Sequence, residues 1–267
     1  MDSIVSPLSV PALAAEAWRN AAKAARPALP WLALLSLAGG FFNWAFEVGG
    51  GTLLALAALS CVFVAGVQAS LTAYRAMIPG AQGRFMALMH MNLAIYLAFF
   101  FIGFFVLFFV GLFGVIMLQM SGLVDLSAEG ADAQIESALS AMMATPYGWA
   151  LAAVYATGLT GLCYLALRLL LAGAATARTG QVMVFRTWGW TKGHVVRLGL
   201  ASLATHVAPC VAGFLAHLAL SAMIGPGDAG LFLSGIVFIA LQIPFLLAGH
   251  GLAAAALPPA PPAMDVA

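Results

Sequence analysis

The residues of this chain that could do chemistry lie inside apolar stretches of its second half. His206 and His217 are eleven residues apart, so they fall on nearly one face of a helix. Cys210 lies one turn from His206 on that face, and Ser202 lies one turn the other way. His250 lies in the next apolar stretch, which runs back across the same depth and could approach His206.

These groups could form a metal site or a proton relay, because imidazole serves both as a metal ligand and as a proton carrier. Pro209 and Pro244 would kink the two helices and free backbone carbonyls for a polar pocket. A metal site would normally include a carboxylate, and none lies in the middle of an apolar stretch. Neutral histidines bonded between helices explain the same residues, and we favour that packing role.

A second group of candidate ligands opens another apolar stretch, where Met86, Met89, His90 and Met91 could bind copper(I). At such a position methionine more commonly serves as an adaptable apolar filler, and we favour that interpretation. The sequence contains no Gly-rich phosphate loop and no HExxH, GxSxG or CxxC motif. We therefore predict neither a cofactor nor an enzymatic activity.

The composition decides which elements must position these residues. Of the 267 residues, 64% are apolar and 7% are charged, and the mean hydropathy is +1.05. A soluble domain of this length cannot hide so much apolar surface. The apolar runs are continuous rather than alternating, so the class is an all-α transmembrane bundle. The net charge of +1 and the lack of a Lys/Arg-rich block give no sign of a nucleic-acid partner.

About six spans are predicted, since crossing the hydrocarbon takes roughly 20 apolar residues as a helix. The spans are expected at 30–47, 52–77, 89–120, 147–172, 195–224 and 230–256. The chain is thus divided into an amphipathic interfacial segment (1–29), a six-helix domain (30–256) and a disordered Pro-rich tail (257–267). Pro27 and Pro30 should break the helix before the first span, which is short and interrupted by Gly39-Gly40.

The basic residues predict the orientation of the bundle. With both termini inside, every Lys and Arg falls in or beside an inside segment, as the positive-inside rule requires. These residues are Arg19, Lys23, Arg26, Arg75, Arg84, Arg168, Arg178, Arg186, Lys192 and Arg197. Arg168 is expected to lie inside the fourth span and to snorkel to the same side. The outside segments carry acids alone, and the longest of them (122–146) predicts an acidic amphipathic helix on the outer surface or over the bundle.

Small residues should mark the places where helices pack inside lipid. The candidates are Ala153, Thr157 and Gly161 on the fourth span, and Cys61, Ala65 and Ala69 on the second. The cysteines Cys61, Cys163 and Cys210 are expected to be small buried hydrophobic residues rather than a disulfide or metal set.

The inside loop 173–198 is the most distinctive segment of the chain. Aromatic residues alternate there with cations, as in interfacial segments that place rings at headgroup depth and cations on lipid phosphates. The predicted headgroup-binding residues are Arg178, Arg186, Trp188, Trp190, Lys192 and Arg197. Gly193 should end the interfacial helix and let the chain turn into the fifth span.

This loop also carries a family resemblance. The run from Thr187 to Gly193, followed by Arg197-Leu198, resembles the signature S-W-x-L-T-[RK]-G-x-x-x-R-L. That signature is typical of uncharacterised six-helix bacterial membrane proteins related to the membrane domain of glycerophosphodiester phosphodiesterases. The chain departs from it at Trp190, where leucine is common, and at Val196, where an aromatic residue is common. The resemblance implies a bacterial inner-membrane location. It implies no hydrolase activity, because the catalytic barrel is missing from this sequence.

Three functions are compatible with these residues. We favour a non-enzymatic integral membrane protein that interacts with anionic membrane lipids or supports a membrane-protein partner or a second copy of itself. The alternative is a transporter or permease for a small or apolar solute, favoured by the interrupted first span and the kinked last two spans. An intramembrane enzyme that uses His206, Cys210 and His250 ranks third.

Overall fold

The computed structural model describes residues 9–49, 51–124 and 132–258, and within them the regular structure is helical. The acids Asp125 and Glu129 and nearly all of the predicted tail lie outside this range. The helices are α1 (Val10–Glu47), α2 (Thr52–Met77), α3 (Phe85–Ser121), α4 (Asp132–Met142), α5 (Pro146–Leu169), α6 (Ala172–Thr179), α7 (Arg186–Trp190), α8 (Val195–Ser202), α9 (Ala208–Ser221), α10 (Asp228–Leu241) and α11 (Ile243–Ala255). A π-helical turn, Leu203–Val207, joins α8 to α9.

Six helical segments are long and apolar enough to cross a membrane, as predicted. They are α1, α2, α3, α5 with α6, α8 with α9, and α10 with α11. The all-α, six-span fold class is confirmed. The last two spans are each built of two helices, and their breaks lie near the proline positions noted in the sequence.

The chain divides into two compact units. The first contains Met1–Ala94 and Leu167–Ala267, and the second contains Ile95–Ala166. The first unit therefore holds α1, α2, α6 to α11 and the start of α3, whereas the second holds the rest of α3, α4 and most of α5.

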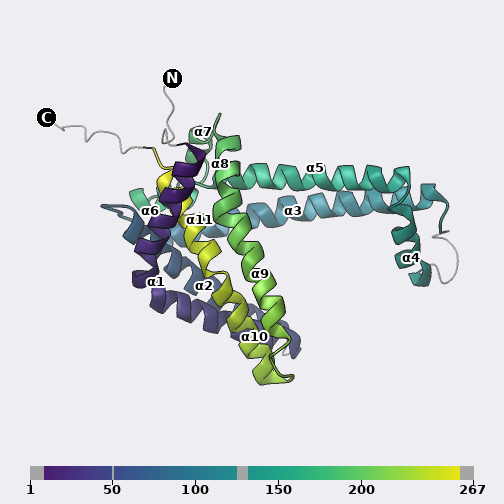
Figure 1. The fold of residues 1–267 in the computed structure, drawn as a ribbon, viewed down its shortest axis with the longest axis horizontal. Helices are drawn as coiled ribbons and strands as arrows, with labels where there is room; N and C mark the ends of the chain where they lie inside the picture. Colours follow the sequence, from purple (N-terminus) through teal and green to yellow (C-terminus); the bar gives the residue numbers. More distant parts are fainter. Residues whose placement is uncertain (1–8, 50, 125–131, 259–267) are drawn as a thin grey trace. The chain divides into compact units, whose positions relative to one another are not determined.

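Helix α1 is continuous, so the predicted break at Pro27 and Pro30 is wrong. Figure 1 shows α1 bending between its two halves instead of ending there. A proline can remain inside a helix when the surrounding packing supports the bend. That packing is visible in Leu13 and Ala17, which are buried in one cluster with Leu171, Leu198 and Leu252. The alanine-rich face of the first half of α1 therefore packs on the bundle and does not lie on lipid.

The glycine pair in α1 is a helix crossing and not an interruption of the span. A methyl group on Gly235 of α10 would lie 2.6 Å from the carbonyl oxygen of Gly39 and 2.9 Å from Cα of Gly40. Asn43 Nδ2 donates to the Leu231 carbonyl oxygen at 2.7 Å beside the same crossing. Close backbone approach of this kind is how glycine promotes helix packing in lipid.

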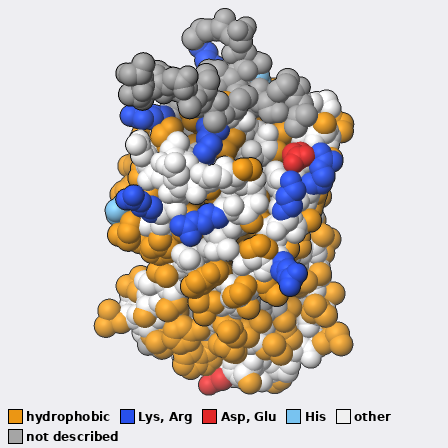
Figure 2. All heavy atoms as spheres, turned by 90° about the vertical axis from the view of Figure 1, so that its left-hand side faces the viewer, with side chains coloured by type: hydrophobic (Ala, Val, Ile, Leu, Met, Phe, Trp, Pro, Cys, Tyr) orange, Lys and Arg blue, Asp and Glu red, His pale blue; other side chains and the backbone are white. Residues whose placement is uncertain are grey.

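The cations of the first unit gather at one end of it. Figure 2 shows that most Lys and Arg side chains on one face of the molecule lie toward its top, whereas hydrophobic side chains dominate its lower part. The cluster of Leu13, Leu171, Leu198 and Leu252 joins the start of α1, α6, α8 and the end of α11 at one end. Asn43 and Leu231 join the other end of α1 to the start of α10. The start of α1, α6, α8 and the end of α11 thus share one end of the unit.

The second unit is an antiparallel hairpin of α3 and α5 with α4 packed at its tip. Met142 and Ala138 of α4 are buried against Leu118 and Leu151, so part of the predicted acidic amphipathic segment forms a helix over the hairpin. The predicted packing stripe of Ala153, Thr157 and Gly161 is wrong, because all three residues are exposed. Gly158 makes the contact instead, since a methyl group there would lie 2.7 Å from Val106.

The predicted burial of the cysteines is wrong for two of them. Cys61 and Cys163 are exposed on the protein surface, and Cys210 is partly buried. Ala65 and Ala69, which share the predicted stripe on α2 with Cys61, are buried. A cysteine on a membrane span is apolar enough to face lipid, which is why composition alone does not separate the two positions.

Candidate functional site

The loop between α6 and α8 is built by turns that the sequence encodes. Gly180 ends α6 in the left-handed conformation, with φ of 71°. The Met183 amide then donates to Thr176 Oγ1 at 3.1 Å, which folds the chain back on α6. Gly193, with φ of 81°, separates α7 from α8 as predicted. The interfacial helix itself is short, since α7 has five residues.

Arg168 anchors this loop from inside the unit. Its side chain is 5% exposed, its Nη2 donates to the Trp188 carbonyl oxygen at 2.6 Å, and its guanidinium lies 4.5 Å from the Trp188 ring centroid. Thr191 Oγ1 donates to the Arg168 carbonyl oxygen at 3.2 Å. The prediction that Arg168 snorkels is therefore wrong, because backbone and ring partners of the loop hold its charge.

Arg178 has a similar structural role, because it joins α6 to the residues that follow α11. Its Nη1 donates to the Pro258 carbonyl oxygen at 2.6 Å, and its guanidinium lies 5.8 Å from the Trp190 ring. Trp188 and Trp190 are both half-buried. Three of the predicted headgroup-binding residues thus contact the protein itself, where they close the loop.

The remaining loop residues are accessible. Arg186 and Lys192 are exposed, whereas Arg197 is partly buried. Phe185, which precedes Arg186, is 79% exposed, and Val196 is 77% exposed. We call Phe185, Arg186 and Lys192, together with Val196 in the first turn of α8, the exposed loop residues. Two cations beside large apolar side chains form the combination that sits at a membrane interface.

His206 and His217 lie in a separate place, where the π-helical turn and α9 contact α10 and α11. The His206 ring packs edge-on against Phe245, with centroids 5.7 Å apart. His217 packs in the same way on Phe238 at 5.2 Å. The two histidines thus share a helix face, as their spacing predicts.

His250 has its own partners in the first unit. Its Nδ1 lies 2.7 Å from the Leu246 carbonyl oxygen and must donate to it, because a carbonyl only accepts. Its ring centroid is 4.6 Å from that of Tyr74. The His206 ring packs on α11 at Gly249, the residue directly before His250. Among the described residues, no three His, Cys, Asp or Glu side chains come together where they could hold a metal ion.

The methionine group of α3 does not converge on one point either. Met86 is 54% exposed, whereas Met91 is 2% exposed. His90 is exposed. These side chains therefore lie on different sides of the helix, and the structure does not assemble them as one set of ligands.

Sequence reasoning missed Gln242, which lies at the break between α10 and α11. Its Nε2 donates to the Cys210 carbonyl oxygen at 3.4 Å and thereby joins the two last spans. The available signal was a lone amide two residues before Pro244 in an apolar run. Polar side chains at membrane depth are candidates for function or for interhelical bonds.

Replacing Gly249 by alanine should displace the His206 ring. A methyl group on Gly249 would lie 2.6 Å from His206 Nε2, and overpacking of this kind costs about 1–3 kcal/mol. Thermal unfolding in detergent measures the loss. The matched control is Gly103→Ala in α3, where a methyl group meets nothing within 4 Å. Equal midpoints for the two variants would contradict the contact between His206 and Gly249.

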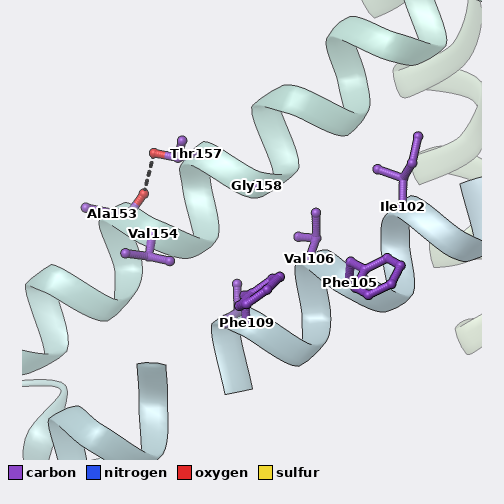
Figure 3. A pocket seen from close by; sticks show the side chains of 9 residues that line it. Ile102, Phe105, Val106, Phe109, Ala153, Val154, Thr157 and Gly158 are labelled. Atoms are coloured by element: carbon purple, nitrogen blue, oxygen red, sulfur yellow. Dashed lines mark hydrogen bonds between the residues drawn. The ribbon is translucent and has the colours of Figure 1, made fainter. Parts of the chain in front are cut away.

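A groove in the second unit is almost entirely apolar. It has a volume of about 560 Å³ and lies between α3 and α5, with Phe105, Val106 and Val154 among its lining residues. Figure 3 shows its one hydroxyl group, Thr157, bonded to the Ala153 carbonyl oxygen at 2.8 Å. The groove therefore offers no free polar group to orient a ligand.

Fold and site together define a class of protein: a multi-pass α-helical membrane protein with a folded basic-aromatic loop at one end of its larger unit. Comparison with protein-family models, curated proteins and solved structures found no match for the chain. The family resemblance of the loop therefore stays a prediction.

Proposed function

We propose that this chain is a non-enzymatic protein of a bacterial inner membrane, with both termini in the cytoplasm, whose α6–α8 loop binds anionic lipid headgroups. The observation that carries this proposal is that some cations hold the loop in place while others stay exposed. Arg168 and Arg178 hold the loop in place, while Arg186 and Lys192 stay exposed beside Phe185.

The physical case rests on preorganisation. A cation near an anionic membrane surface contributes about 1 kcal/mol, and a loop that is already ordered loses little entropy when it binds. The Phe185 ring can enter the acyl boundary while Arg186 meets phosphates. Two such cations give about 2 kcal/mol, or roughly a thirty-fold preference for anionic lipid.

The charge distribution supports the proposed orientation. All ten Lys and Arg residues fall in or beside segments predicted to be inside. The acids Glu47, at the last residue of α1, and Asp228, at the first residue of α10, lie at the other end of these helices. Because cytoplasmic loops carry the excess of Lys and Arg, the end with the α6–α8 loop faces the cytoplasm in this proposal.

The family resemblance gains a physical reason from the same contacts. Trp188 supplies the ring and the carbonyl for Arg168, Thr191 bonds back to Arg168, and Gly193 takes the left-handed conformation. These are three positions of the signature described above. A loop of this shape is what we propose that the chain shares with that family.

The lipid proposal predicts that the variant R186A/K192A loses selectivity for anionic lipid. The purified protein would be titrated with phosphatidylglycerol and with phosphatidylcholine in detergent, and bound lipids would be counted by native mass spectrometry. We expect the preference for phosphatidylglycerol to fall by roughly thirty-fold. The matched control is R19A/K23A, which removes two cations that pair with Glu16. An equal loss in both variants would mean a general charge effect and would overturn the proposal.

Transport remains the second candidate function, on one specific observation. The fifth span contains a π-helical turn before Pro209, and the sixth breaks at Gln242 before Pro244. Helices interrupted at membrane depth are typical of transporter binding sites. The glycine pair in α1 no longer favours this function, because it serves a helix crossing.

A further inference from the structure

A recess with three walls lies between α3, α4 and α5 at the tip of the hairpin, where Figure 1 shows α4. Its volume is about 520 Å³, which is in the range of ligand-binding cavities. Val115 of α3, Leu139 of α4 and Leu151 of α5 are among its lining residues. The whole lining belongs to the second unit, so the recess is complete within one compact part of the chain.

Two glycines leave the room for this recess. Within residues 104–120 of α3, every side chain is of valine size or larger except at Gly111 and Gly114. Both glycines line the recess, and their spacing of three residues places them on one side of the helix. A methyl group on Gly111 would meet nothing within 4 Å. The chain thus keeps this space free of its own side chains.

Helix α4 supplies an apolar wall of the recess. Ala138 and Met142 are buried against the hairpin and hold α4 in place. Leu139 and Met143, which line the recess, are 40% and 48% exposed, and Glu136 is exposed as well. An amphipathic helix of this kind lies at a membrane interface with its apolar side toward the acyl chains. Aliphatic chains are therefore the material that meets this wall.

The dimensions of the recess favour lipid chains over a helix of another protein. From Val110 to Leu118 α3 rises about 12 Å, so the volume corresponds to a mean cross-section of roughly 43 Å². A helix with its side chains is about 10–12 Å wide, which requires roughly 80 Å² or more. Val110 also lines the groove of Figure 3, which continues to Ile102. A long, narrow and apolar space of this kind fits aliphatic chains.

The charges of the sequence around α4 indicate which headgroup accompanies these chains. The segment 122–146 contains no Lys or Arg, and its acids are Asp125, Glu129, Asp132 and Glu136. Such a segment repels an anionic headgroup and attracts an ammonium group. Tyr155 adds one hydroxyl to the lining of the recess, and tyrosine suits a site that is apolar at one end and polar at the other.

We propose that the recess binds the acyl chains of a zwitterionic phospholipid with an ammonium headgroup, such as phosphatidylethanolamine. The site differs from the α6–α8 loop in its unit, in the part of the lipid that it contacts and in the headgroup that it accepts. The inference therefore stands independently of anionic lipid binding by the exposed loop residues.

Filling the recess tests the proposal. Gly111→Leu puts a side chain into open space, and the matched control is Gly103→Leu, at a site on α3 that is equally open but does not line the recess. Phosphatidylethanolamine with a photoactivatable diazirine on one acyl chain would be added to the protein in a mild detergent and irradiated. Trypsin would then release residues 85–168 as one fragment, because the next basic residue after Arg84 is Arg168.

We expect the label on this fragment to fall at least fivefold in Gly111→Leu and to be unchanged in Gly103→Leu. Phosphatidylglycerol with the same chains should label the native fragment at least threefold less, and R186A/K192A should keep the phosphatidylethanolamine label. Val115→Phe narrows the recess from the same wall and replaces Gly111→Leu if that variant does not fold. Equal labelling of the native and filled chains would mean that only bulk lipid touches this surface and would overturn the inference. A native dimer that takes no label there would assign the recess to a second copy and would overturn it too.

Discussion

Replacing Gly235 by leucine is expected to separate α1 from α10 and to cause a large loss of stability. The first carbon of the new side chain would lie 2.6 Å from the Gly39 carbonyl oxygen and 2.9 Å from Gly40 Cα. These neighbours are backbone atoms, which cannot move aside as a side chain does. We expect a loss of about 3 kcal/mol or more in the free energy of unfolding.

Thermal unfolding in a mild detergent measures this effect, and Gly161→Leu on α5 is its control. Both glycines lie in apolar helices, but a methyl group on Gly161 meets nothing within 4 Å. The control should keep its unfolding midpoint, while the Gly235 variant should lose several degrees. Equal midpoints would show that α1 and α10 do not cross at their glycines.

The second large effect is expected for Arg168→Leu, which should release the α6–α8 loop. The change removes a charged hydrogen bond, with a net value of about 1.5–3 kcal/mol, and a cation–π contact of up to about 2 kcal/mol. Leucine leaves the carbonyl of Trp188 without its 2.6 Å donor. Trypsin should then cut after Arg186 or Lys192 at least tenfold faster, as read from the intact mass of the detergent-solubilised protein.

Arg84→Leu provides the control for this experiment, because Arg84 is exposed in another loop of the same unit. It removes one cation without touching Trp188. Arg168→Lys should give an intermediate rate, because lysine keeps the charge but lacks the planar fork of arginine. Unchanged cleavage in Arg168→Leu would contradict the anchoring role.

The class of the fold could be predicted because it depends on summed properties. Continuous apolar runs determine where helices can cross a membrane, and all six spans appear in the structure. Gly193 could also be placed correctly. A glycine between two helical segments often takes the left-handed conformation that ends the first helix, and Gly193 does so. Predictions of this kind need no knowledge of neighbours.

The errors concern contacts between helices, where several faces of one helix look equally suitable. The exposed stripe of Ala153, Thr157 and Gly161 and the partly buried Gly158 lie on the same apolar helix. In lipid no polar face tells one side from another. The partner, Val106 in this case, decides which face is used, and its position depends on the whole fold.

The sequence indicated which residues of the α6–α8 loop to consider. It did not indicate which of them bond to the protein and which stay exposed. Arg178 and Arg186 look alike in the sequence, yet one bonds to Pro258 and the other is exposed. Arg168 lies twenty residues before Trp188, and nothing local links them. Gln242 gains its meaning from the Cys210 carbonyl on another span. Long-range pairing of this kind separates the cations that hold the loop in place from those that stay exposed.

The most direct test of the proposed lipid binding is native mass spectrometry of the protein extracted from its own membranes in a mild detergent. We expect the native chain to carry anionic phospholipid masses that R186A/K192A loses and R19A/K23A keeps. A native chain that emerges bare, or lipid that stays equally bound to all three proteins, would contradict the assignment of Arg186 and Lys192 as headgroup ligands.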